Sequence, residues 1–220
     1  MKDNSAISPT AHLLRPFGPP IGFFQLPENL TDILMEITDQ IIASDNKISH
    51  GASLAGQIEE EPLIPEQILK EAGLDKYFKH CAKAYTIQTY NDPIPGAVVP
   101  TQKFEDIKID LGPVWVISQY EGEYNPLHFH RNCTLSAVLY LKKPDKKPRN
   151  IPNKADLDGF IQWSYHSVVP DTFELGTFTT EPEVGSLFIW PSHLMHTVYP
   201  FLGAGERRSV SFNATHTLTY

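Results

Sequence analysis

Two stretches in the first half of the chain place apolar residues at the spacing of one helical face. In residues 27–44, PENLTDILMEITDQIIAS, Asn29 or Thr31 can cap the N-terminus, and the apolar positions are Leu30, Ile33, Leu34, Ile37 and Ile41. In residues 65–85, PEQILKEAGLDKYFKHCAKAY, Pro65 stands at a typical first helical position, and the apolar positions are Ile68, Leu69, Ala72 and Phe78. The pattern predicts one helix in each stretch.

From about residue 97 onward the pattern changes to short β-type runs separated by glycine and proline. The runs are FEDIKIDLG, VWVISQY, TLSAVLYL, FIQWSYH, GTFTTEP, GSLFIWP, HTVYPF and RRSVSFNATH. A series of about eight strands without a helix among them predicts a mainly β sandwich or barrel, one face of which the two helices would cover. We therefore expect a single domain over residues 1–220, with an N-terminal supporting segment at 1–96 and a β core at 97–220.

Two of these runs alternate in a way that predicts which face each side chain occupies. In TLSAVLYL, one face carries Thr134, Ser136, Val138 and Tyr140, whereas the opposite face is fully apolar. In RRSVSFN, one face carries Arg207, Ser209, Ser211 and Asn213, and the other carries Arg208, Val210 and Phe212. A polar strand face inside a protein needs partners, because unpaired buried polar groups are costly. A bound anion would supply them.

Three of the nine histidines lie where a metal site can be built. His128 and His130, in YNPLHFHRN, are two residues apart and would point the same way on an extended strand. His196 follows the apolar run GSLFIWP and stands directly before another predicted strand. Two ligands on one strand and a third distant in sequence are typical of an open-sided metal site in a β barrel.

Composition narrows the class of protein. The formal net charge of -8 and the pI near 5.5 argue against binding to nucleic acid, which calls for clustered Lys and Arg. The chain has only two cysteines, Cys81 and Cys133, which are too few to stabilise a domain of this size by disulfide bonds. We expect both to be free thiols. We see neither a signal peptide nor a run of apolar residues long enough to cross a membrane, and we expect a cytoplasmic protein without membrane contact. The sequence is compatible with a homodimer but does not specify an oligomeric state.

Several ordered motifs resemble those of a known enzyme family. The segments SQYEGEYNPLHFH, LSAVLYLKKP and EPEVGSLFIWPSHLMHTVYPFLGAGERRSVSFN look like the Fe(II)- and 2-oxoglutarate (2OG)-dependent oxygenases, in the branch near prolyl hydroxylases. They are most similar to short oxygenases found in phages and marine bacteria, and the N-terminal stretch LAGQIEEE also looks like that subgroup. The resemblance covers roughly residues 110–213. It implies a double-stranded β-helix, or jelly roll, with supporting helices.

The resemblance also implies roles for individual residues. His128 and His196 match the metal-binding histidines of the family, and His130 stands where most members have a carboxylate. If His130 were not a ligand, the nearest carboxylates would be Glu121 and Glu123, neither at the family spacing. The residues expected to contact 2OG are Arg207, Ser209 and Tyr140, with Tyr120 and Asn125 as weaker candidates near the metal-bound end. Arg207 is preferred over Arg208 because of strand parity, and its planar guanidinium suits a carboxylate.

The implied activity is hydroxylation of a peptidyl residue, an amino acid or a small metabolite, using Fe(II), 2OG and O2 and releasing succinate and CO2. Two alternatives remain open. A cupin-type metal enzyme that does not use 2OG would also carry His-x-His on a strand, but it needs a further Glu ligand and does not need Arg207. A non-catalytic jelly-roll binding module would hold a structural ion or none.

Overall fold

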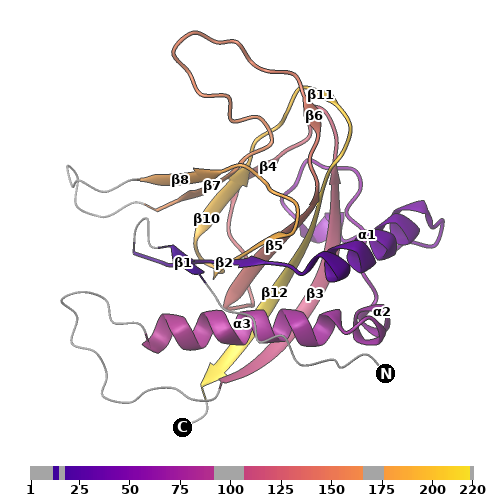
Figure 1. The fold of residues 1–220 in the computed structure, drawn as a ribbon, viewed down its shortest axis with the longest axis vertical. Helices are drawn as coiled ribbons and strands as arrows, with labels where there is room; N and C mark the ends of the chain where they lie inside the picture. The colour runs from indigo at the N-terminus through magenta and orange to yellow at the C-terminus, as the bar shows by residue number, and fades with distance from the viewer. Residues whose placement is uncertain (1–11, 15–17, 92–106, 166–175, 219–220) are drawn as a thin grey trace.

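The computed structural model describes residues 12–14, 18–91, 107–165 and 176–218, and it consists of two antiparallel sheets with helices on one side (Figure 1). The large sheet has the strand order β1 (His12–Leu14), β2 (Ile21–Gln25), β9 (Ser186–Pro191), β5 (Leu135–Lys142), β12 (Arg207–Leu218), β3 (Ile107–Gln119). The small sheet has the order β4 (Asn125–His128), β10 (Met195–Val198), β7 (Ile161–Ser164), β8 (Thr177–Thr180). A third pair joins β11 (Gly203–Ala204) to β6 (Asp145–Lys146). The helices are α1 (Glu28–Ala43), α2 (Glu66–Glu71), α3 (Leu74–Asn91) and the short η1 (Gly51–Ser53).

The core divides into two layers, one on each face of the large sheet. The outer layer joins α1 and α3 to this sheet, and within it the ring of Phe78 stacks on that of Phe212 with 4.8 Å between centroids. The inner layer lies between the sheets and contains Tyr140, Trp163 and Trp190. Because the apolar set of β5 belongs to the outer layer and Val138 and Tyr140 to the inner one, the predicted alternation is confirmed. The architecture is the expected mainly β jelly roll.

The N-terminal segment departs from the prediction in two ways. The second predicted helix is two helices, α2 and α3, because Gly73 between them has a φ of 74°, a left-handed conformation that ends a helix. Residues 12–14 and 21–25 form β1 and β2, and β2 pairs with β9 inside the large sheet, although no strand was expected before residue 97. The run IGFFQ is short and shows no clean period, so the pattern alone could not assign it. The expected boundary at residues 96 and 97 lies outside the described residues.

The strand pattern of the second half also shows differences. The runs FEDIKIDLG and VWVISQY were expected as separate strands, but their parts within residues 107–119 form the single long strand β3. Strands β4, β6 and β11 were not predicted individually, since each has only two to four residues. Cys81 is buried and Cys133 is half-buried, and both are free thiols as expected. None of the helices in the described part of the chain has the length and apolar character needed to span a bilayer.

Strand β12 separates its two arginines as the parity argument predicts. Arg208 points to the outer layer, where its guanidinium pairs with Asp39 of α1 and donates to Glu206 through Nε at 2.5 Å and Nη2 at 2.8 Å. Arg207 points the other way and lines a cavity between the sheets. The two neighbours therefore have different surroundings and different partners.

Candidate active site

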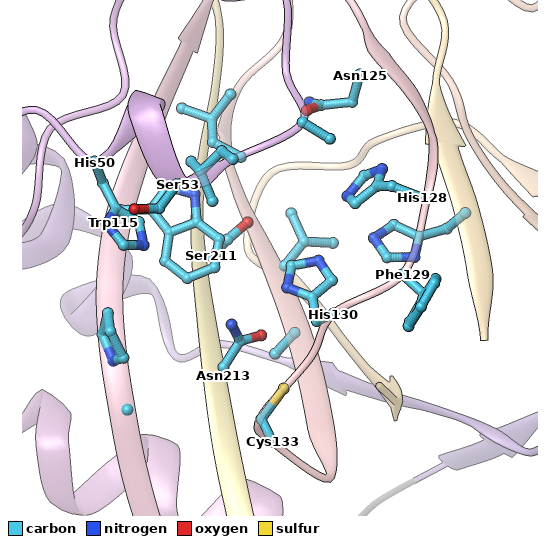
Figure 2. A pocket seen from close by; sticks show the side chains of 18 of the residues that line it. His50, Ser53, Trp115, Asn125, His128, Phe129, His130, Cys133, Ser211 and Asn213 are labelled. Carbon is cyan, nitrogen blue, oxygen red and sulfur yellow. The ribbon is translucent and has the colours of Figure 1, made fainter. Parts of the chain in front are cut away.

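Three histidines meet on one wall of this cavity, which has a volume of about 760 Å³. His128, at the end of β4, is the register partner of His196 on β10, and their ring centroids are 4.2 Å apart. His130 follows β4 and is held by a backbone hydrogen bond from its N–H to the carbonyl of Ser192, at 3.0 Å. The nitrogen atoms that the three rings offer lie within 4.8 Å of one another. Figure 2 shows His128 and His130 opposite Trp115, and we call the three histidines the imidazole triad.

The hydrogen bonds of two rings leave one nitrogen of each free for a metal. Nδ1 of His128 lies 2.6 Å from the carbonyl oxygen of Pro126, and Nδ1 of His196 lies 3.0 Å from that of Leu194. Each Nδ1 can thus donate to a carbonyl, which places the lone pair on Nε2. Burial lowers the pKa of all three rings, that of His130 to about 4. The triad is therefore neutral at pH 7, the state in which imidazole binds metal ions.

No carboxylate among the described residues joins the triad. The two carboxylates considered as substitutes for His130 are occupied elsewhere. Glu121 accepts the backbone N–H of Gly203 at 2.8 Å, and Glu123 accepts the backbone N–H groups of Glu59 and Tyr120 at 2.9 and 2.7 Å. The set of donors that the structure brings together is three neutral imidazoles, a set that suits Fe(II) or another divalent transition metal.

Arg207 is a buried cation without a counter-charge in the described part of the chain. Its side chain is 1% exposed, Nε donates to the carbonyl of Gly159 at 3.0 Å, and Nη1 donates to Oε1 of Gln119 at 3.2 Å. Its Nη2 has no hydrogen-bond partner. Burial lowers the pKa of Arg207, but a guanidinium remains charged at neutral pH. An unpaired buried charge is strongly unfavourable, so the site is incomplete without an anion.

Two further polar groups lie beside this guanidinium without partners. The Ser209 hydroxyl and the Tyr140 hydroxyl are both buried and make no hydrogen bond, and the two residues are register partners on β12 and β5. The guanidinium carbon of Arg207 lies 4.9 Å from the centroid of the Tyr140 ring. One cation and two hydroxyls on neighbouring strands form a donor set that a carboxylate would satisfy. The residues therefore fit one carboxylate of an anion such as 2OG.

The two weaker candidates for contact with 2OG, Asn125 and Tyr120, lie in different places. Asn125 is buried and lines the cavity, at the first residue of β4, the strand that ends at His128. Tyr120 does not reach the cavity: it is 46% exposed. The reason is a turn in which the N–H of Glu123 bonds the carbonyl of Tyr120 and Gly122 has a φ of 83°. This turn directs Tyr120 to the surface, so the structure does not support its expected contact with 2OG.

Several residues of the cavity or its support were not predicted from the sequence. Gln119 holds Arg207, His50 and Trp115 line the wall across from the triad, and Glu61 also lines the cavity (Figure 2). Glu61 and His50 come from the connection between α1 and α2, whose pattern gave no element. Two stretches of the sequence pointed there: SHGASLAGQ, a candidate for shaping the entrance that contains His50, and LAGQIEEE, whose last residue is Glu61.

Glu61 makes stability depend on pH. Burial, with a smaller contribution from the charge of Glu123, raises its pKa to about 7 from the 4.5 of an exposed carboxyl. The folded state thus holds this proton more tightly than the unfolded state, and stability falls as pH rises from about 4.5 to 7. We expect Glu61→Gln to remove this loss, making the protein more stable than wild type at pH 8 by about 3 kcal/mol and equal to it at pH 4.5.

Urea unfolding at the two pH values measures this difference. Glu60→Gln is the matched control, because the neighbouring Glu60 pairs with Lys47 at 2.9 Å outside the cavity. An E61Q protein that is no more stable than wild type at pH 8 would contradict the assignment.

Comparison with known proteins agrees with this geometry. Residues 113–213 match the family described as "Putative 2OG-Fe(II) oxygenase". The matched segment contains the imidazole triad, Arg207, Ser209 and Tyr140. Residues 113–213 are thus similar to the 2OG-Fe(II) oxygenases, a family defined by the use of Fe(II) and 2OG. Among curated proteins, none matches the chain in sequence.

Solved structures share the fold at low sequence identity. A prolyl-4-hydroxylase from Pseudomonas putida has a TM-score of 0.51 and 16% identity, over 89% of this chain and 91% of that one. The 2OG-dependent epimerase SnoN of nogalamycin biosynthesis has a TM-score of 0.57 and 12% identity, over 91% and 81%. AviO1 from Streptomyces viridochromogenes has a TM-score of 0.51 and 12% identity, over 88% and 89%. These likenesses establish the jelly-roll fold.

Proposed function

We propose that the protein is a hydroxylase that converts a C–H bond of its substrate to C–OH while 2OG and O2 become succinate and CO2. The observation that carries this proposal is the pairing, in one cavity, of the neutral imidazole triad with the uncompensated guanidinium of Arg207. The triad offers ligands for a metal, and Arg207 offers a counter-charge for the cosubstrate. The substrate is a peptidyl residue, an amino acid or a small metabolite.

In this proposal each residue has a defined task. His128, His130 and His196 hold Fe(II), and Arg207 binds the far carboxylate of 2OG with Ser209 and Tyr140. When bound, the metal and 2OG together supply the oxidising chemistry with O2. The chain contributes orientation and exclusion of water: Gln119 and the Gly159 carbonyl fix the guanidinium, and the carbonyls of Pro126 and Leu194 fix two of the rings. Asn125 lies near the metal-bound end.

His130 gives this centre an unusual charge. A carboxylate in its place would cancel one of the two positive charges of Fe(II), whereas three neutral imidazoles cancel none. The two anionic carboxylates of 2OG then have both the metal and Arg207 to compensate them. A cupin-type enzyme has less support for two reasons. It would need a carboxylate as a fourth metal ligand, which the described residues do not provide beside the triad. It would also give the buried guanidinium of Arg207 no ligand to bind.

The proposal is tested by following succinate formation from 2OG in the purified protein, without an added substrate. We expect slow turnover that requires both Fe(II) and O2 and that stops when the metal is chelated. Omitting either Fe(II) or O2 provides the controls. Absence of succinate, at 2OG concentrations up to the millimolar range, would favour a binding module or a metal enzyme that does not use 2OG.

A further inference from the structure

The connection between α1 and α2 brings one glutamate into the cavity and leaves its two neighbours outside. Residues 60–64 lie along the free edge of β3, with hydrogen bonds from Val116 N–H to the Pro62 carbonyl at 2.8 Å and from Ser118 N–H to the Glu60 carbonyl at 3.0 Å. Because side chains alternate along an extended segment, Glu60 faces outward and pairs with Lys47, whereas Glu61 faces inward. Glu59 is exposed. Three consecutive glutamates thus have three environments.

The carboxylate of Glu61 has no partner in the described part of the chain. The residue is 2% exposed, its Oε1 makes no hydrogen bond, and no cation of the described residues pairs with it. The charged group that affects the pKa of Glu61 is Glu123, which is also a carboxylate and therefore raises this pKa further. A buried carboxylate without a donor is unfavourable by the same argument that applies to Arg207. The cavity therefore holds a second unsatisfied group, a carboxyl that becomes negatively charged as the pH rises above its pKa of about 7.

The other charged or titratable groups of the cavity do not supply this counter-charge. Arg207 has the role proposed above, and Arg131 is exposed, with its guanidinium carbon 5.4 Å from the ring centroid of Phe129. Burial lowers the pKa of His50, which is therefore neutral at pH 7. Asp110, which also lines the cavity, is itself acidic and pairs with Lys108.

A second acceptor lies close to the carboxylate. At Gly56, the position of a Cβ would be 2.8 Å from Oε1 of Glu61 and 2.7 Å from Oδ1 of Asn125, so the two oxygens approach the same point from different segments. Oε1 of Glu61 has no hydrogen-bond donor among the described residues. A carboxylate oxygen without a donor, beside the amide oxygen of Asn125, suits a ligand that carries several N–H groups on one charged nitrogen.

We propose that Glu61, with Asn125 beside it, binds the cationic nitrogen of the substrate, so that the enzyme acts on compounds bearing an ammonium or guanidinium group. This inference rests on the proposed function, because it assumes that the wall across from the triad is the substrate side of the cavity. Trp115 and His50 line the same wall, and their ring centroids are 5.2 Å apart (Figure 2). They would pack against the apolar part of such a compound.

The test measures binding of simple cations and their neutral counterparts to wild type, Glu61→Gln and Glu60→Gln. The pairs are n-butylammonium with 1-butanol, pyrrolidinium with tetrahydrofuran, and methylguanidinium with methylurea. Ligand-observed NMR at pH 8 gives the affinities, both for the protein alone and for the protein loaded with Zn(II) and 2OG. We expect wild type and E60Q to prefer at least one cation over its neutral counterpart by about 10-fold or more, and E61Q to lose this preference.

Two results would overturn the inference: wild type that prefers none of the cations, or E61Q that keeps the preference. Both are independent of the proposed function, because the protein alone reports the preference without turnover. If instead 2OG fails to bind and no succinate forms while the preference depends on Glu61, the oxygenase proposal fails and the cation site stands.

Discussion

Replacing Arg207 with methionine is expected to raise the 2OG concentration required for half-maximal turnover by about 100-fold or more. Methionine keeps much of the apolar volume but removes the only guanidinium of the described residues that is buried in the cavity. Truncating one partner of a buried, hydrogen-bonded charge pair costs about 2–5 kcal/mol, and 1.4 kcal/mol corresponds to tenfold in affinity. The measurements are the KM for 2OG in the succinate assay and the Kd for 2OG of the Zn(II)-loaded protein.

Arg208→Met is the matched control, because the two arginines are adjacent on β12 and have opposite environments. Removing Arg208 leaves Glu206 and Asp39 without their main cation, so the thermal midpoint should fall by several degrees while the affinity for 2OG stays within about twofold of wild type. Arg207→Met should not lower the midpoint of the free protein, since it removes an uncompensated buried charge. Loss of 2OG affinity in R208M but not in R207M would refute the assignment.

Most of the site could be predicted because its residues lie on strands with a clear period. The alternation in β12 separated Arg207 from Arg208, and the alternation in β5 placed Tyr140 on the inner face. The spacing of His128 and His130 indicated that both rings point to one side, and both belong to the triad, although β4 ends at His128 and His130 lies beyond the strand. In each case a single property, the two-residue period of an extended chain, determined the face without knowledge of the tertiary structure.

The remaining parts depend on contacts between segments that have no period of their own. Glu61 reaches the cavity only because residues 60–64 pair with the edge of β3, and a short polar segment between two helices carries no signal of such pairing. Tyr120 was expected to contact 2OG because the predicted strand run VWVISQY includes it. In the structure the chain leaves the strand at this residue and turns at Gly122, so the side chain lies at the surface. The strand β2 was missed because its five residues are too few to show a period.

The second large effect concerns the metal. Replacing His128 or His196 with alanine is expected to weaken Fe(II) or Co(II) binding by about 100-fold or more, because even residues that only support a metal ligand typically contribute 10- to 100-fold to affinity. Metal analysis after dialysis and titration with Co(II), followed by its visible absorption, measure this loss without relying on turnover. His193→Ala is the control, since His193 is exposed in the same turn and lies outside the triad.

The same titration tests whether His130 is the third ligand. We expect His130→Ala to lose the metal as the other two variants do, and His130→Asp to keep one metal ion per chain, because a carboxylate at this position is the usual ligand of the family that the sequence resembles. The added negative charge should also strengthen binding of the divalent ion relative to three neutral imidazoles. If H130A bound Co(II) as tightly as wild type, the centre would have only two protein ligands, and the charge argument for three neutral imidazoles would be wrong.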